Sequence, residues 1–452
     1  MYIDQYHLTD LPNKTVAAGI DTVIMAFANS SLFLTSAGNY TPFEPVSTMR
    51  ARLDPGAKVL FAIGGWADTA GFAAGAATED SRKEYAKNVA HTIERLGFDG
   101  VDCDWEYPGG NGADYKQNPN SNKTGEIETY PLLLAAIKEA IGDKELSIAV
   151  PGKQVDMIAY TKEQSPKIWE AVDYVNIMTY DLMNRRDTVT HHHTDLKGSL
   201  EAVDYYIEEL GLSPCKALLG IAMYAKYFTL DPASPCETGL GCKTVLLEDE
   251  TGADTGKSGP VTFEKANYAE APANLTDSPD GSCGAAVGYR CGPGYCCSSY
   301  GFCGNGTDYC GTNCLSDYGR CDSVSISTLF KTAMANGVTD EENGAEYYYD
   351  KPNNVWWTWD TPELITLKFE KIIKARGLAG IFGWSGGEDS YDWSHILAMQ
   401  AGVKSLSYQE FDPAYTLRPT HSSTPQGFPY IYDNKREGSR ADKSRDHDRH
   451  QS

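Results

Sequence analysis

Three carboxylic acids alternate with apolar residues in one short stretch of the chain. Asp102, Asp104 and Glu106 occupy every second position of the segment LGFDGVDCDWEYP, residues 96–108. Side chains point alternately to the two faces of a β-strand, so in a strand these acids share one face at a spacing of about 6–7 Å. Burial and mutual repulsion oppose the ionisation of such acids. We therefore interpret the row as an acid/base site; the alternative is an edge strand with a solvated acidic face.

The segments around this row predict an α/β fold. Short apolar runs alternate with amphipathic segments, which is typical of a parallel sheet covered by helices. The predicted helices cover residues 81–96, 129–141, 196–210 and 362–375. The predicted strands cover residues 2–6, 22–28, 58–64, 100–105, 145–150, 174–180, 217–223 and 379–384. These strand–helix units predict a (β/α)8 TIM barrel, whose active site lies at the carboxyl ends of the strands.

The connection after the seventh predicted strand is too long for a barrel loop, so we expect an inserted α+β subdomain there. Cys236 and Cys242 would close a short loop near its start, and a helix would cover 325–336. A cysteine-rich module interrupts the subdomain, and the charged tail is predicted to be disordered. The predicted division is 1–225 and 362–405 for the barrel, 226–280 and 323–361 for the subdomain, 281–322 for the module, and 406–452 for the tail.

The acidic row also carries a family resemblance. DGVDCDWE resembles the DxxDxDxE signature of the family-18 glycoside hydrolases, with Asp99 in its first position. The motifs AIGG at 62–65, MTYD at 178–181 and MYAK at 223–226 resemble those of the family's third, sixth and seventh strands. Ala62 replaces a serine of the family pattern, and Lys226 stands where arginine is usual. The resemblance covers roughly residues 1–405 and leaves the acids intact.

The resemblance implies a role for each acid. Glu106 would be the general acid/base, and the substrate's own N-acetyl oxygen would attack the anomeric carbon, a retaining route without a carboxylate nucleophile. Asp104 would hold the acetamide N–H and share a proton with the deeper Asp102, and Tyr180 would bind the acetamide oxygen. The pair of aspartates should raise the pKa of Glu106, so that the three acids titrate together. The implied substrate-binding residues are Trp66, Tyr107, Met178, Asp181, Tyr224, Lys226 and Trp384, the last as the floor of the −1 sugar.

The cysteine-rich segment resembles hevein, the type-1 chitin-binding domain, in its CCSSYGFC core at 296–303. Eight cysteines allow 105 pairings. The resemblance implies the pairs Cys283–Cys297, Cys291–Cys303, Cys296–Cys310 and Cys314–Cys321. It also implies that N-acetylglucosamine is held by Ser298, Tyr300, Phe302 and Tyr309. A purely structural disulfide knot is the alternative, although aromatics in so small a module should stay exposed.

Other conspicuous residues receive structural interpretations. Asp99 has the opposite parity to the other acids, and Cys103 should be a buried free thiol on the helix-facing side of its strand. Cys215 has no obvious partner. The histidines at 191–193 lack metal-ligand spacing and support, so we expect a solvated loop or a sugar contact there. The tryptophans at 356, 357 and 359 are either subdomain core or sugar platforms, and the resemblance favours Trp359–Asp360 near the cleft.

The amino-acid composition limits which classes of molecule the protein can bind and indicates the compartment in which it folds. The net charge of −23 argues against nucleic acid or anionic membranes as partners, and no apolar run could span a bilayer. The clustered cysteines indicate an oxidising compartment and hence secretion. Six sequons agree with secretion, and since no signal peptide is visible we expect the natural N-terminus to be missing. The sequons are at Asn13, Asn29, Asn39, Asn122, Asn274 and Asn305.

Together these features predict a secreted, monomeric endochitinase that acts on chitin and chitooligosaccharides without metal or cofactor. Fungal killer-toxin-like chitinases combine the same two features. The alternatives are a catalytically inactive chitin-binding lectin and an endo-β-N-acetylglucosaminidase that acts on N-glycans. Lectins of this type typically lose the acid at the position of Glu106, and the cysteine module weighs against the N-glycan enzyme.

Overall fold

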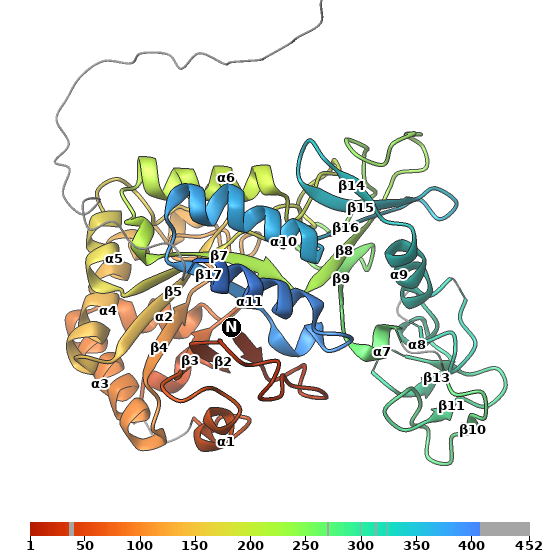
Figure 1. Cartoon of the computed structure of the whole chain (residues 1–452), viewed down its shortest axis with the longest axis horizontal. Coiled ribbons are helices and arrows are strands. Elements are labelled where there is room, and N and C mark those ends of the chain that lie inside the picture. Colours follow the sequence, from red (N-terminus) through yellow and green to blue (C-terminus); the bar gives the residue numbers. More distant parts are fainter. Residues whose placement is uncertain (36–39, 269–270, 299, 312–313, 323, 407–452) are drawn as a thin grey trace, which may run out of the picture. The chain divides into compact units, whose positions relative to one another are not determined.

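The computed structural model describes residues 1–35, 40–268, 271–298, 300–311, 314–322 and 324–406 (Figure 1). Eight parallel strands form its main sheet in the order β1-β2-β3-β4-β5-β6-β7-β17, and β1 lies beside β17, so the sheet forms a nearly closed barrel. The barrel fold predicted from the sequence is confirmed. The strands are β1 Tyr2–Asp4, β2 Thr22–Ala28, β3 Lys58–Gly64, β4 Gly100–Asp104, β5 Glu145–Pro151, β6 Tyr174–Met178, β7 Ala217–Ala222 and β17 Gly380–Trp384.

Helices cover the outer face of the barrel, and α6 and α10 lie side by side on it (Figure 1). Helix α3 shows how local sequence sets their ends: Thr78 and Ser81 form a capping box at its start, and Gly97 ends it with a φ of 78°. The covering helices are α1 Val46–Ala51, α2 Ala70–Ala76, α3 Glu79–Leu96, α4 Glu126–Ile141, α5 Ser165–Ala171, α6 Leu196–Asp204, α10 Pro362–Lys368 and α11 Ser394–Leu406. Helices α6 and α10 continue as single π-helical segments, Tyr205–Glu209 and Phe369–Lys374.

Strand alternation separates two cores. Val101 and Cys103 on β4 pack outward against the helices, whereas Ala62 and Phe382 pack inside the barrel. Cys103 is a buried free thiol, as predicted, and Cys215 is free and exposed. Strand β1 ends at Asp4, earlier than predicted, because the Asp4 carboxylate accepts the backbone N–H groups of Tyr6 and His7 and turns the chain.

A second sheet follows directly after β7. Its antiparallel strands lie in the order β14-β15-β16-β8-β9, and helix α9, Ile326–Ala335, packs on β15. The predicted helix at 325–336 is therefore present. Short helix α7 covers Lys265–Tyr268. The strands of this insertion are β8 Tyr224–Thr229, β9 Ser258–Thr262, β14 Val338–Asp340, β15 Ala345–Asp350 and β16 Val355–Trp359.

The cysteine-rich segment holds short elements tied by disulfides. The structure pairs Cys283–Cys297, Cys291–Cys303, Cys296–Cys310 and Cys314–Cys321, and Cys236–Cys242 closes the predicted loop outside the segment. Its elements are β10 Thr276–Asp277, β11 Tyr289–Arg290, β12 Cys296–Cys297, β13 Cys303–Gly304 and α8 Thr307–Cys310. The disorder predicted for the tail concerns residues that, beyond 406, lie outside the described part of the chain.

Among the helices of the described residues, none has the length and apolar character that crossing a membrane requires.

Candidate active site

The acid deepest in the barrel is Asp102, and donors from three other strands hold it. Tyr2 Oη donates to Asp102 Oδ2 at 2.8 Å, while Ser147 Oγ and Asn176 Nδ2 donate to Oδ1 at 2.6 and 3.1 Å. Burial raises the pKa of Asp102 to about 6, although the three hydrogen bonds act in the opposite direction. Asp102 and Asp104, which both belong to the described part of the chain, form no direct hydrogen bond with each other. The proton that they were expected to share therefore stays a prediction.

Asp104 ends β4 with an unsatisfied carboxyl oxygen. The residue is 4% exposed, and its Oδ1 has no hydrogen-bond partner within the described chain. Burial, followed by the charges of Glu106 and Asp102, raises the pKa of Asp104 well above its ordinary value. Glycine is required beside it, because a Cβ on Gly64 would lie 2.2 Å from the Asp104 carbonyl oxygen. The glycine motif at the end of β3 therefore lets the two strand ends approach.

Glu106 follows β4 by two residues and lines a cleft at the mouth of the barrel. Its pKa is raised to about 7, chiefly by burial and then by the charges of Asp181 and Asp156, while a hydrogen bond from Tyr107 acts against the rise. The direction agrees with the sequence-based expectation, and burial, which that expectation did not include, is the largest cause. Glu106 and Asp104 also interact with each other, because the charge of Glu106 is one of the causes that raise the pKa of Asp104.

The cleft has a volume of about 420 Å³. All the residues expected from the sequence to bind substrate lie along it, as do Glu106 and Tyr180, whereas Asp102 and Asp104 are not among the lining residues. The lining residues among those predicted are Trp66, Glu106, Tyr107, Met178, Tyr180, Asp181, Tyr224, Lys226 and Trp384. The insertion supplies one wall, from Asp254 and from Ser258, Gly259, Pro260 and Thr262 on β9.

Asp181 organises one side of this cleft. Its Oδ1 accepts a hydrogen bond from Tyr224 Oη at 2.8 Å and pairs with Lys226 Nζ at 3.0 Å. Lys226, which departs from the family pattern, thus forms an ion pair from strand β8 of the insertion. The backbone of Asp181 has a φ of 55°, a conformation that an Asp tolerates better than most residues.

Aromatic side chains mark two positions along the cleft. Trp384 stacks on Phe27 with ring centroids 5.4 Å apart, which leaves it supported from behind. Trp66 is 47% exposed and touches Tyr107 edge to face. The guanidinium of Arg186 lies 5.5 Å from the Trp66 ring and 4.0 Å from the Tyr115 ring. The flat rings of Trp384 and Trp66 are suited to stacking against the pyranose rings of a sugar chain.

Thirteen of the residues that line the cleft were not predicted from the sequence, and His7, Asp156, Arg186 and Glu388 are four of them. These four lie in loops or in short 3-10 helices after the strands, where no periodic pattern marks a side chain as facing the site. The only available signal was their position shortly after predicted strands, which they share with many loop residues.

The structure corrects the interpretation of the three histidines. His192 and His193 are buried, so the predicted solvated loop is wrong for them. His192 contacts Thr358 Oγ1 and Asp340 Oδ2, each at 3.0 Å. His193 packs against Tyr224 with ring centroids 5.4 Å apart, and burial lowers its pKa well below the usual value. The segment connects β6 to α6 and is buried because it packs against residues of the insertion.

The tryptophans of β16 belong to the core of the insertion, not to the cleft. Trp357 and Trp359 pack in one cluster and Trp356 in another, all with 5% exposure or less. Neither Trp359 nor Asp360 is among the residues that line the cleft. Asp360 is instead buried in an ion pair with Lys368. Asp99 has the structural role predicted for it, since it pairs with Arg50 at 2.7 Å and accepts Val59 N–H.

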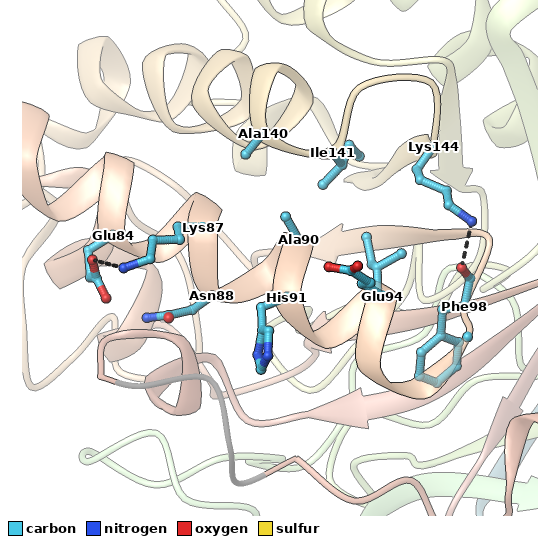
Figure 2. Close-up of a pocket in the computed structure, with 12 residues that line it drawn as sticks. Glu84, Lys87, Asn88, Ala90, His91, Glu94, Phe98, Ala140, Ile141 and Lys144 are labelled. Atoms are coloured by element: carbon cyan, nitrogen blue, oxygen red, sulfur yellow. Dashed lines mark hydrogen bonds and ion pairs between the residues drawn. The ribbon is translucent and has the colours of Figure 1, made fainter.

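A larger hollow of about 920 Å³ lies on the outside of the barrel between α3 and α4 (Figure 2). Lys87 pairs there with Glu84, and Lys144 donates to the Phe98 carbonyl oxygen (Figure 2). None of the acids of β4 lines it. The hollow therefore has no part in the site at the strand ends.

Comparison with known proteins agrees with this geometry. Residues 1–389 match glycosyl hydrolases family 18. The chain belongs to that family. The family-18 domain is 28% identical to chitinase A1 of Niallia circulans over 242 residues, 48% of this chain and 33% of the relative. It is 31% identical to sporulation-specific chitinase 2 of Saccharomyces cerevisiae over 185 residues, 38% of this chain and 34% of the relative.

Matches of this kind span only a third to a half of the curated relatives; mouse chitotriosidase-1 is 27% identical over 54% of this chain and 53% of the relative. Solved structures agree with the family-18 domain in fold. A Paenibacillus barengoltzii N-acetylglucosaminidase has a TM-score of 0.59 at 20% identity, over 89% of this chain and 98% of that one. Catalytic domain 2 of an Ostrinia furnacalis chitinase has a TM-score of 0.61 at 18% identity, over 89% and 95%.

Proposed function

We propose that the chain is a chitinase that hydrolyses β-1,4 links between N-acetylglucosamine units. The observation that carries this proposal is the placement of Glu106, a carboxylic acid with a pKa of about 7, beside the unsatisfied Oδ1 of Asp104 in an aromatic-lined cleft. A group with that pKa is suited to give and take a proton near neutral pH. Relatives whose names describe chitinases support the choice of substrate.

In the proposed reaction Glu106 donates its proton to the glycosidic oxygen as the bond to the leaving sugar breaks. The acetamide oxygen of the sugar on Trp384 attacks the anomeric carbon and forms an oxazolinium ion. Asp104 accepts the acetamide N–H and balances the positive charge, and Tyr180 donates to the acetamide oxygen. Water then opens the ring as Glu106 takes back a proton, so configuration at the anomeric carbon is retained. Asp102 holds its place through Tyr2, Ser147 and Asn176 below the site.

Product analysis on chitohexaose tests the proposal. We expect shorter N-acetylglucosamine oligomers whose newly formed ends are initially β-anomers, because the substrate-assisted route retains configuration. Binding without cleavage would instead favour a chitin-binding lectin. Preferential cleavage of N-glycans would favour an endo-β-N-acetylglucosaminidase.

The pH dependence should report the environment of Glu106. Since Glu106 acts as an acid only while protonated, kcat/KM should fall as the pH rises through about 7. The charge of Asp156 raises this pKa, so Asp156→Asn should move the alkaline limb to lower pH. Glu79→Gln, which changes an exposed acid on α3, is the matched control and should leave the limb in place. A limb unmoved by Asp156→Asn would contradict the electrostatic assignment.

The cysteine-rich segment is proposed to bind chitin separately from the cleft. Tyr300 is 86% and Phe302 59% exposed, on a turn where Ser298 Oγ accepts the Phe302 N–H at 3.3 Å. Replacing Tyr300 and Phe302 by alanine removes two stacking faces worth about 1 kcal/mol each, so binding to insoluble chitin should weaken roughly thirtyfold. Hydrolysis of short soluble substrates should be unaffected.

Sedimentation with chitin particles measures this effect. Tyr295→Ala is the matched control, because Tyr295 is an exposed aromatic of the same segment outside the positions predicted to grip the sugar. An equal loss on soluble and insoluble substrates would show that the segment is no separate binding site.

Secretion agrees with the five disulfides, which are typical of proteins that fold in an oxidising compartment.

A further inference from the structure

A polar cluster joins the first and last strands of the barrel next to Trp384. Asp4 ends β1, and Ser385 and Glu388 follow β17. The Asp4 carboxylate accepts hydrogen bonds from the backbone N–H groups of Tyr6 and His7, from Ser385 Oγ and from His7 Nδ1. Its oxygens are therefore fully used inside the protein.

His7 keeps one donor that no described residue of the chain uses within hydrogen-bond distance. Its Nδ1 lies 3.0 Å from both oxygens of Asp4, so this nitrogen carries a proton. Burial alone would lower the pKa of His7, but the bond to Asp4 and the charges of Glu388, Asp4 and Glu264 raise it to about 9. The Nε2–H, 3.8 Å from Glu264 Oε2, is too far for a hydrogen bond, and the side chain is 26% exposed on the cleft.

Glu388 supplies the complementary acceptor. Its Oε1 lies 3.4 Å from His7 Nδ1, whereas its Oε2 is buried and has no partner within the described chain. The residue is 4% exposed, yet it lines the cleft together with Trp384 and His7. A buried polar oxygen without a partner costs free energy, which a ligand that donates a hydrogen bond would recover.

A metal ion is the competing occupant, because ligand atoms of Asp4, His7 and Glu388 lie within 4.8 Å of one another. The contacts favour a different ligand. A metal would have to displace the proton on His7 Nδ1 and the four donors already bound to Asp4. The free groups are instead one N–H donor and one carboxyl oxygen, and a sugar hydroxyl can accept from the first and donate to the second.

We propose that His7 and Glu388 form a specificity-determining contact that binds a hydroxyl group of a sugar unit next to Trp384. This inference rests on the proposed function. The hydroxyl accepts from His7 Nε2 and donates to Glu388 Oε2, which fixes the sugar edge while Trp384 supports its face. Both side chains are buried or half-buried. A substrate that lacks this hydroxyl group would leave them without a hydrogen-bond partner and should therefore bind more weakly.

Kinetics and calorimetric binding on chitohexaose test the contact. Glu388→Ala should raise KM and Kd about tenfold and change kcat less than about threefold, because it removes one hydrogen bond to a charged or buried group. Glu388→Gln keeps an acceptor oxygen and should restore most of the affinity. His7→Asn keeps the donor to Asp4 and removes only the Nε2 donor, so it should also raise KM. Glu79→Ala, the loss of an exposed carboxylate on α3, should change neither constant.

The outcomes are separable. Unchanged KM and Kd in both Glu388→Ala and His7→Asn would overturn the contact while leaving the chitinase proposal intact. A merely structural role would lower the unfolding temperature and would leave Glu388→Gln as impaired as Glu388→Ala. If Glu388→Ala does not fold, His7→Asn decides. A wild-type protein that neither cleaves nor binds chitohexaose overturns the proposed function and the contact together.

Discussion

Glu106→Gln is expected to lower kcat on chitohexaose by about three orders of magnitude. A positioned general acid/base contributes typically 10²–10⁴-fold, and glutamine cannot give a proton to the leaving oxygen. The side chain keeps its size, and the Asp102 hydrogen bonds to Tyr2, Ser147 and Asn176 do not involve it. The cleft should therefore still bind chitooligosaccharides, with a Kd within a few-fold of that of the parent.

Steady-state assays measure kcat, and calorimetry on the same preparation measures Kd. Asp99→Asn is the matched control from the same stretch: Asp99 faces Arg50 and the Val59 N–H, away from the cleft, and asparagine can still accept that N–H. Its turnover should stay within about twofold of the parent. Turnover retained by Glu106→Gln would remove Glu106 from the acid/base role.

The parts that sequence predicted well depend on short-range patterns. Alternation along residues 100–105 placed Asp102 and Asp104 on one face and Cys103 on the other. In the structure Asp102 bonds to Tyr2 and Ser147 inside the barrel, Asp104 interacts with Asp102, and Cys103 packs in the outer core. Several barrel strands were recognisable because a strand covered on both sides is a nearly continuous apolar run. The disulfide pairs followed from a resemblance, since the cysteine order alone allows many pairings.

The parts that sequence missed depend on contacts between distant residues. Tyr2 and Asn176 reach Asp102 across 100 and 74 positions of sequence, and only closure of the barrel brings them together. His192 looked like a solvated loop residue because its partners, Thr358 and Asp340, come from the insertion. His7 and Glu388 meet at the seam between β1 and β17, where the two ends of the barrel sheet adjoin.

The sequence also could not predict all the groups that raise the pKa of Glu106. Proximity along β4 pointed to Asp102 and Asp104 as the groups that raise the pKa of Glu106. In the folded chain the largest effect is burial, and the charges of Asp181 after β6 and Asp156 after β5 add to the interaction of Glu106 with Asp104. A strand repeat gives neighbours along one strand, whereas the field at a barrel mouth is set by loops from several strands.

Lys368→Met is expected to destabilise the protein by about 3–5 kcal/mol, because it leaves the carboxylate of Asp360 buried without its counter-charge. The Nζ of Lys368 lies 2.6 Å from Asp360 Oδ2, and both side chains are 0% exposed. Lys368 also donates to Thr194, to its backbone oxygen at 3.1 Å and its Oγ1 at 3.0 Å. The ion pair thus ties the end of β16 to helix α10 and to the segment after β6 that carries Asp181.

Urea unfolding measures the loss as a lower midpoint. Lys374→Met is the matched control from the same helical segment: its partner Glu370 is 55% exposed, and a surface pair of this spacing contributes only about 0.3–0.5 kcal/mol. The double variant Asp360→Asn/Lys368→Met should recover part of the stability, because it no longer buries an unpaired charge. Equal midpoints for Lys368→Met and Lys374→Met would show that the pair does not hold the insertion to the barrel. If the ion pair does hold the insertion to the barrel, Lys368→Met should also lose the binding of chitooligosaccharides at urea concentrations below its unfolding midpoint. The reason is that β8 and β9 of the same sheet build the cleft wall.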